Sequence, residues 1–165
     1  MPNDDFAEWI RPHIGSLARI SRAFAAPADR DDLLQELMLS VWKARPAFRG
    51  DSAVSTYVFR VAHNRALTWI GRKKQQGVRE AEISAQAHLL WGVDAEDGAQ
   101  LEQLYAAMQA LPPMDRSLLL LMLEGMSYAD IGALHGVSVS NVGVRLHRAR
   151  AELNRLVAKE ASDEA

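Results

Sequence analysis

Apolar residues recur at helical spacing along almost the whole 165-residue chain, and this periodicity constrains the fold more than any other feature. No alternating run is long enough to predict a strand. Prolines and glycines divide the periodic segments, because proline interrupts a helix and glycine commonly ends one. The predicted helices cover residues 4–25, 30–45, 53–75, about 99–111, 113–124, a short segment from Tyr128, and Ser138 to Val157. We therefore expect an all-α fold.

The segment 113–157 ends in a pattern that is typical of a helix-turn-helix unit. Ser127 and Asp130 have the spacing of a capping box, with Asp in place of the usual Glu. Gly136 supplies a turn before Ser138, which is the expected N-cap of the last helix. In the short helix, the residues expected to point inward are Tyr128, Ile131 and Leu134. The unit predicts a DNA reader, and an ordinary three-helix bundle is the alternative interpretation.

Charge is strongly segregated although the net charge is only −2. Residues 43–74 carry eight Lys and Arg against one acid, and residues 138–159 carry five against one. Residues 80–102 carry six acids and neither Lys nor Arg. Two basic blocks on helices with apolar faces favour two polyanion-binding surfaces, whereas solvated helix faces are the simpler alternative.

The chain is predicted to form two small helical domains joined by a linker. Residues 76–98 interrupt the helical pattern with Gly, Gln and Asp, as linkers do. We therefore divide the chain into domains at 1–75 and 99–165. The apolar stretch AHLLW within the linker, which contains Leu89, Leu90 and Trp91, is expected to pack on a domain or to serve a partner.

Nothing in the sequence indicates an enzyme, a cofactor or a metal site. There are no cysteines, and the five histidines lack a metal-ligand spacing such as HExxH. No Gly-rich phosphate loop is present. The N-terminus has no apolar core of a signal peptide, and the longest apolar run, 118–123, is too short to cross a bilayer. We expect a cytoplasmic protein without membrane insertion.

Two segments resemble bacterial RNA polymerase sigma factors of the compact extracytoplasmic-function (ECF) group. DDLLQELMLSVWKARPAFRGDSAVSTYVFRVAHNRALTWIGRKK resembles region two, and ALPPMDRSLLLLMLEGMSYADIGALHGVSVSNVGVRLHRARAEL resembles region four. The order of the two segments and the absence of a region three between them match that group. The resemblance implies a polymerase subunit that directs promoter recognition, DNA melting and transcription initiation.

Region two implies capture of an unpaired base of the promoter's minus-ten element. A flipped base needs a stacking surface and hydrogen-bond groups, and backbone phosphates need Arg and Lys. The matching residues are Phe48, Arg49, Gly50, Asp51 and Ser52 in the AFRGDS loop, and Tyr57, Arg60, Asn64 and Arg65 on the following helix. For Tyr57, a role as a core aromatic residue is an equally good interpretation.

Region four implies contact with the minus-thirty-five element through the last helix. The matching residues are Ser140, Asn141, Val144, Arg145 and Arg148. Arg can pair with guanine and Asn with adenine. The pair Gly143-Val144 departs from the polar pair that many members of the family carry, so the promoter sequence cannot be transferred from relatives. A contact between Val144 and a thymine methyl group is compatible with this departure.

The resemblance also implies partners. The matching polymerase-binding residues are Asp31, Asp32, Gln35 and Glu36, within DDLLQE. An acidic helix surface suits a basic coiled coil, although acids at a helix N-terminus also complement the macrodipole. The implied partners are core RNA polymerase, promoter DNA and an anti-sigma factor.

Two other functions remain as alternatives. A helix-turn-helix regulator that does not replace the sigma subunit would use the tail alone, with residues 1–75 for sensing or dimerisation. The basic third helix and the AFRGDS loop argue against this, because a dimerisation module needs neither. A decoy that sequesters an anti-sigma factor would be expected to lose the basic residues that this chain keeps.

Overall fold

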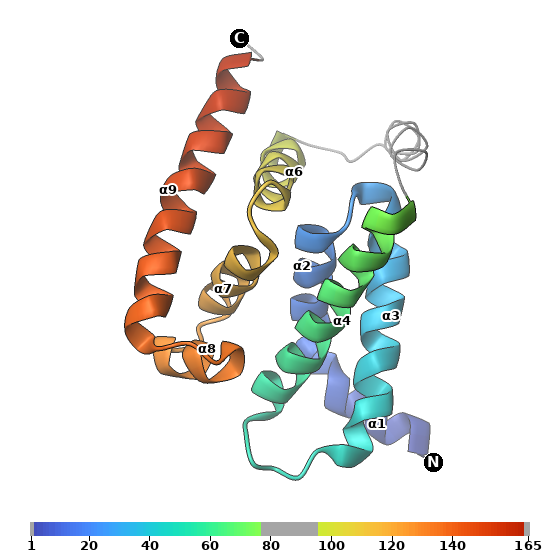
Figure 1. Cartoon of the computed structure of the whole chain (residues 1–165). Coiled ribbons are helices and arrows are strands. Elements are labelled where there is room, and N and C mark those ends of the chain that lie inside the picture. The colour runs from blue at the N-terminus through green and yellow to red at the C-terminus, as the bar shows by residue number, and fades with distance from the viewer. Residues whose placement is uncertain (1, 77–95, 164–165) are drawn as a thin grey trace. The chain divides into compact units, whose positions relative to one another are not determined.

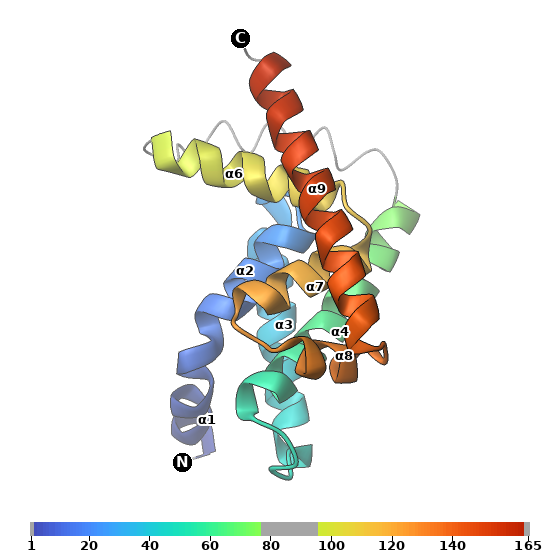
Figure 2. The same ribbon diagram turned by 90° about the vertical axis from the view of Figure 1, so that its left-hand side faces the viewer.

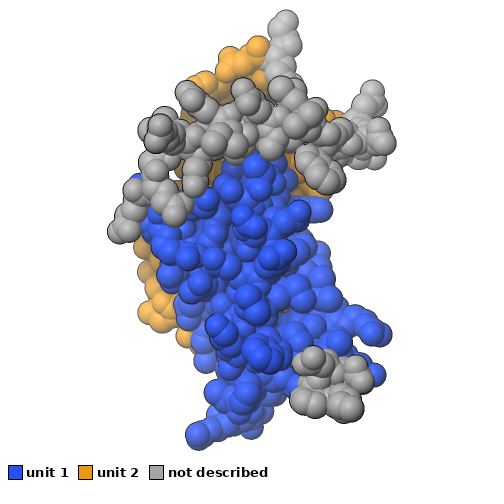
Figure 3. All heavy atoms as spheres, turned by 90° about the vertical axis from the view of Figure 1, so that its right-hand side faces the viewer, with its two compact units in different colours: residues 1–84 blue, residues 85–165 orange. Residues whose placement is uncertain are grey.

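The computed structural model describes residues 2–76 and 96–163, and within these ranges its secondary structure is entirely helical (Figure 1). The all-α prediction is therefore confirmed for the described residues. The chain separates into two compact units, unit 1 with residues 1–84 and unit 2 with residues 85–165, which are coloured separately in Figure 3. The AHLLW stretch and most of the predicted linker lie outside the described residues, so the expectations placed on them stay predictions.

Unit 1 is a helical bundle in which α2, α3 and α4 lie side by side (Figures 1 and 2). Its elements are α1 (Pro2–Ile10), η1 (Arg11–His13), α2 (Ile14–Phe24), η2 (Pro27–Asp29), α3 (Arg30–Ala44), η3 (Arg45–Ala47) and α4 (Val54–Gln76). Its core contains the fully buried side chains of Leu17, Leu33, Leu37 and Val58. Burying each of these side chains contributes roughly 1.5–3 kcal/mol of hydrophobic stabilisation.

The first predicted helix, 4–25, is not continuous. A short 3₁₀ turn at Arg11–His13 separates α1 from α2, with Pro12 in its first turn. Proline has no amide hydrogen and its ring clashes with the preceding turn of an α-helix, which explains the interruption. As a result, the axes of α1 and α2 point in different directions (Figure 2).

The buried face of α4 also differs from the predicted one. The apolar periodicity of this segment predicts that Leu67 is buried, but its side chain is 40% exposed, whereas Phe59, His63 and Trp69 are buried. This helix packs against both α2 and α3, so two adjacent stripes of its surface are covered rather than one. In α3, the periodicity likewise predicts that Trp42 lies on the apolar face, but its side chain is 48% exposed.

In unit 2, the long helix α9 packs against three shorter helices. The elements are α6 (Glu96–Gln109), α7 (Pro113–Leu123), α8 (Tyr128–His135) and α9 (Val139–Asp163). The core includes the buried side chains of Leu118, Leu121, Ile131, Val142 and Leu146. The last helix continues to Asp163 and does not end at Val157 as predicted.

Among the residues that the structure describes, no helix has both the length and the apolar character that a membrane span requires. In the same ranges, no cluster of His, Asp and Glu side chains has the composition of a metal site.

Candidate functional site

The turn between α8 and α9 is built by the local signals that the sequence contains. The backbone N–H of Asp130 donates to Ser127 Oγ over 3.1 Å, and the N–H of Asn141 donates to Ser138 Oγ over 3.1 Å. These two serines are the predicted N-caps, and the structure confirms both. Gly136 has φ +69°, in the left-handed region that glycine adopts without strain. The predicted helix-turn-helix geometry is therefore present.

A second glycine in this turn, Gly132, was not singled out from the sequence. A Cβ atom at this position would lie 2.6 Å from the carbonyl oxygen of Val137, a backbone atom that has no room to move. The Gly132 carbonyl in turn accepts a hydrogen bond from the N–H of Val137 over 2.9 Å. Position 132 requires glycine because the backbone of the following turn passes close to α8. In the sequence, the signal for this requirement is the spacing of four residues between Gly132 and Gly136.

One face of α9 exposes most of the predicted minus-thirty-five residues. Ser140, Asn141 and Arg148 are exposed, and Val144 is 47% exposed. The opposite face, with Val142, Leu146 and Ala149, is buried against the other helices of unit 2. Amide, hydroxyl, guanidinium and methyl groups therefore lie on one accessible side of the helix, as major-groove contact requires.

Arg145 differs from its predicted neighbours on α9. Its Nη1 atom lies 3.4 Å from Asp115 Oδ1, on α7. This ion pair connects the expected recognition helix to the helix beneath it. The guanidinium group of Arg145 therefore has a partner on α7 within unit 2.

Tyr128 does not point inward as the sequence indicated. It is 39% exposed, and its ring lies beside Gly143 of α9, where an added Cβ would be 3.7 Å from Tyr128 Cε2. The ring covers the glycine position rather than entering the core, because Tyr128 is the first residue of α8 and faces the start of α9. The apolar periodicity gave no information about this cross-helix contact.

The predicted minus-ten loop runs between α3 and α4. Gly50 has φ +81°, which allows the tight bend that the sequence predicted. Arg49 and Asp51 are exposed, and the Ser52 hydroxyl donates to the carbonyl of Ala53 over 3.3 Å. At the start of the loop, the rings of Phe48 and Tyr57 lie 5.1 Å apart.

Tyr57 is partly a structural residue. Its hydroxyl donates a 2.6 Å hydrogen bond to the carbonyl of Ala44, at the C-terminal end of α3. This bond satisfies one of the carbonyls that a helix end leaves without a partner in the helix. Tyr57 therefore joins α4 to the end of α3 while its half-exposed ring supports Phe48.

The predicted minus-ten residues of α4 separate onto two faces. Arg60 and Asn64 are exposed. By contrast, Arg65 Nε donates to Glu36 Oε2 of α3 over 3.0 Å. Arg65, predicted to contact DNA, and Glu36, predicted to contact polymerase, are thus ion-paired with each other.

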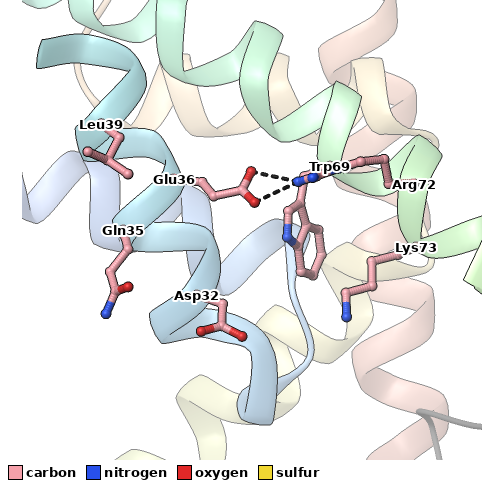
Figure 4. A pocket seen from close by; sticks show the side chains of 7 residues that line it. All are labelled: Asp32, Gln35, Glu36, Leu39, Trp69, Arg72 and Lys73. Carbon is pink, nitrogen blue, oxygen red and sulfur yellow. Dashed lines mark hydrogen bonds and ion pairs between the residues drawn. The ribbon is translucent and has the colours of Figure 1, made fainter. Parts of the chain in front are cut away.

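Three of the four predicted polymerase-binding residues of α3, Asp32, Gln35 and Glu36, line an open pocket of about 330 Å³ (Figure 4). Asp31, Asp32 and Gln35 are exposed, whereas Glu36 is half-buried. The residues that line the pocket are Asp32, Gln35, Glu36, Leu39, Trp69, Arg72 and Lys73. Three of these, Trp69, Arg72 and Lys73, come from α4 and were not assigned to this surface from the sequence. Residues 69, 72 and 73 have the i, i+3, i+4 spacing that places side chains on one helix face, and this spacing is the sequence signal that could have grouped them.

Glu36 is the centre of an ion-pair network within this pocket. Arg72 Nη2 donates to both carboxylate oxygens, over 2.6 and 2.7 Å (Figure 4). Arg65, about two turns earlier on α4, pairs with the same carboxylate over 3.0 Å. Burial raises the pKa of Glu36, but the hydrogen bonds and charges of Arg72 and Arg65 outweigh it and hold the pKa below its usual value. The carboxylate therefore remains ionised at neutral pH.

Family models match both units. The model of sigma-70 region 2 matches residues 9–76, and the model of sigma-70 region 4 matches residues 101–153. The chain is 33% identical over 157 residues to the ECF RNA polymerase sigma factor SigM of Mycobacterium tuberculosis, which covers 92% of this chain and 76% of that protein. It is 26% identical over 153 residues to the ECF RNA polymerase sigma-E factor of Escherichia coli strain K12, over 86% of this chain and 80% of that protein.

Solved structures share the fold. The sigma factor RpoE from Bartonella quintana, in complex with the anti-sigma factor NepR, has a TM-score of 0.71 and 19% identity, covering 93% of this chain and 97% of RpoE. CnrH in complex with the cytosolic domain of CnrY has a TM-score of 0.66 and 24% identity, covering 95% of this chain and 90% of CnrH. Unit 1 matches region 2, unit 2 with its helix-turn-helix matches region 4, and a relative is 33% identical over 92% of the chain. The chain therefore belongs to the ECF RNA polymerase sigma factors.

Proposed function

We propose that this ECF sigma factor divides its work between three surfaces, two for promoter DNA and one for core RNA polymerase. As a member of its family it directs promoter recognition and transcription initiation and is not an enzyme. The observation that carries the division of work is that each unit presents its own exposed cationic helix face. Unit 1 presents Arg60 on α4, and unit 2 presents Arg148 on α9.

The upstream element is read by α9 in the major groove. Asn141 and Arg148 supply the hydrogen-bond groups that distinguish bases, and Val144 offers an apolar contact that suits a thymine methyl group. Arg145 has a mixed role, because its ion pair with Asp115 holds it beside the groove-facing side of the helix. It contributes orientation and charge more than direct base reading.

The melted element is held by the loop 48–52 and the exposed side of α4. Phe48 and Tyr57 provide aromatic surface at the start of the loop, and Asn64 and Arg60 provide hydrogen-bond groups on the helix. Stacking on an aromatic ring is worth roughly 1–3 kcal/mol per base, which offsets much of the cost of unpairing and unstacking that base. Arg65 supports this surface from behind through Glu36 rather than by contact with DNA.

The polymerase-binding surface is the exposed part of α3 around the pocket. Asp32 and Gln35 are accessible for charged and polar contacts, and Leu39 is 53% exposed and adds an apolar contact. Glu36 is engaged by two arginines, so its role is to shape the pocket. We place this activity in the cytoplasm, where the polymerase works.

An anti-sigma factor is a further proposed partner. Two structural relatives, RpoE and CnrH, are solved with an anti-sigma factor and with a CnrY domain, respectively. In this chain Trp42 of α3 and Leu123 of α7, which are 48% and 65% exposed, offer apolar surface in each unit for such a partner. A partner that covers Trp42 would compete with core polymerase for the exposed side of α3, which also carries Leu39.

Run-off transcription tests the proposal. Purified chain is added to core RNA polymerase with fragmented genomic DNA of the same organism, and transcripts are sequenced with and without the chain. The proposed function predicts transcripts that depend on the chain and start at a shared promoter pattern. No dependent transcript, together with sequence-specific duplex binding in the absence of polymerase, would instead support a helix-turn-helix regulator.

A further inference from the structure

A row of four aromatic rings links α1 to the loop 48–52. The ring centroids of Phe6 and Trp9 are 6.1 Å apart, those of Trp9 and Phe48 are 6.1 Å apart, and those of Phe48 and Tyr57 are 5.1 Å apart. The middle contact is the important one, because it joins the N-terminal helix to the first residue of the loop. Aromatic pairs at these separations and tilts are attractive beyond the area that they bury.

Arg45 also contacts α1, through both Asp5 and the ring of Trp9. Its Nη2 atom donates to Asp5 Oδ2 of α1 over 2.6 Å, and its guanidinium carbon lies 5.5 Å from the centroid of the Trp9 ring. A cation over an aromatic face is attracted by the ring quadrupole. Since Arg45 belongs to η3, which immediately precedes Phe48, α1 is held to the chain segment that leads into the loop.

The remaining contacts of α1 show that the row is not part of the main core. Of the side chains of residues 5–10, only Ile10 is buried, and both Phe6 and Trp9 are half-exposed. The core of unit 1 is formed by α2, α3 and α4. A half-exposed tryptophan that contacts a loop residue is better suited to fixing that loop than to stabilising the bundle.

The loop needs such support. Its central residues Arg49, Gly50 and Asp51 are exposed, and Gly50 adds backbone freedom. A loop that must be ordered when it binds loses affinity to the entropy of ordering, whereas a loop already held in its binding conformation does not. Trp9 and Tyr57 hold Phe48 between them, so the entry of the loop is fixed before DNA arrives.

We propose that Trp9 is a positioning residue for the minus-ten loop, which acts through the ring of Phe48 and is itself oriented by Arg45. Trp9 does not contact the base. It sets the position of the aromatic surface on which the base stacks. This inference rests on the proposed function, because it assumes that the loop 48–52 holds the melted element.

The first test measures the loop directly, without DNA. The N–H of Phe48, at the entry of the loop, donates to the Arg45 carbonyl over 3.0 Å. Hydrogen exchange of this amide is followed by NMR in the full chain and in its Trp9→Ala, Trp9→Phe and Glu8→Ala variants. Trp9→Ala is expected to speed this exchange about three- to tenfold, because a ring pair of ordinary strength is lost. Trp9→Phe should retain most of the protection, and Glu8→Ala, an exposed change on the same helix, should retain all of it. Unchanged exchange in Trp9→Ala overturns the proposal.

The second test measures promoter opening by permanganate footprinting with saturating holoenzyme on a promoter recovered by run-off transcription. Trp9→Ala is expected to lower the equilibrium constant for opening about three- to tenfold, with unchanged affinity for core polymerase. Phe48→Ala should reduce opening as well, and Trp9→Ala should add nothing in the Phe48→Ala background, because the two act in one row.

The outcomes distinguish a failure of the positioning role of Trp9 from a failure of the proposed function of the loop 48–52. If Phe48→Ala reduces opening but Trp9→Ala does not, the positioning role of Trp9 is wrong while the proposed function stands. If the two losses add fully, Trp9 acts independently of Phe48 and the proposal is equally wrong. If neither variant changes opening, the loop does not hold the melted element, and both the assignment of the loop and the inference fall.

Discussion

The Glu36 network gives a prediction whose size and pH dependence both follow from the structure. Glu36→Gln keeps the shape of the side chain and removes its charge. In the structure Glu36 accepts hydrogen bonds from Arg72 over 2.6 and 2.7 Å and from Arg65 over 3.0 Å. We expect the variant to unfold more readily, because both arginines lose their ionic partner.

The expected loss in the free energy of unfolding is modest, because the ion pairs of Glu36 with Arg65 and Arg72 are only partly buried. The side chain of Glu36 is 28% exposed, and those of Arg65 and Arg72 are 37% and 49% exposed. Solvent-exposed pairs contribute roughly 0.2–1 kcal/mol each. Two pairs on one carboxylate therefore predict a loss of about 1 kcal/mol in the free energy of unfolding, and 0.5 M NaCl should reduce it by screening.

The pH dependence has a definite sign. The folded-state pKa of Glu36 is lowered, because the two arginines outweigh the effect of burial, which raises it. The network therefore adds stability above the unfolded-state pKa of about 4.3, and this contribution disappears as the pH falls through the lower folded-state pKa. The free energies of unfolding of wild type and Glu36→Gln should therefore differ at pH 7 and become more similar as the pH falls.

Urea unfolding monitored by tryptophan fluorescence measures this difference, because Trp9, Trp42 and Trp69 all lie in unit 1. The titration is repeated at pH 7 and at about pH 3.5, below the unfolded-state pKa. Glu8→Gln is the matched control, because it removes an exposed carboxylate of the same unit. Equal stability of Glu36→Gln and wild type at pH 7, or a difference that persists unchanged in acid, would refute the reasoning.

Three further predictions concern the promoter-reading surfaces. Gly132→Ala should destabilise unit 2 by roughly 1–3 kcal/mol, because the added Cβ clashes with the Val137 carbonyl oxygen. Gly143→Ala meets only ordinary contacts, so it should be neutral or stabilising. Thermal unfolding measures both variants, and equal effects would contradict the role assigned to Gly132. Asn64→Ala should weaken promoter melting more than duplex binding, and unchanged permanganate reactivity of thymines in the melted region would count against it. Arg145→Ala should weaken upstream binding, and Asp115→Ala should lose part of the same affinity in a mobility-shift titration if the ion pair orients Arg145; an unaffected Asp115→Ala would show that it does not.

Local signals predicted the helix-turn-helix well. Ser127, Gly136 and Ser138 determine caps and a turn through hydrogen bonds and backbone angles that span only a few residues. The exposed positions of α9 followed directly, because a buried stripe at helical spacing leaves the opposite side for solvent. Residues such as Asn141 and Arg148 were therefore found where the sequence indicated.

Contacts between helices were predicted poorly. Arg65 and Glu36 are 29 residues apart, and composition cannot show that α3 and α4 bring them together. The resemblance to region two predicts a DNA contact for Arg65, and the structure adds that a carboxylate on the neighbouring helix engages its guanidinium group. Tyr128 was placed inward for a similar reason, since periodicity does not distinguish a core position from one that covers a neighbouring helix.

Transcription from a promoter library, randomised over the upstream and melted elements and read by sequencing, tests the central claim most directly. With core RNA polymerase and this chain, two separate blocks of sequence preference should emerge, one read by α9 and one by the loop 48–52 with α4. Preference in the upstream block alone, or no transcription that depends on the chain, would contradict the claim that both units read the promoter.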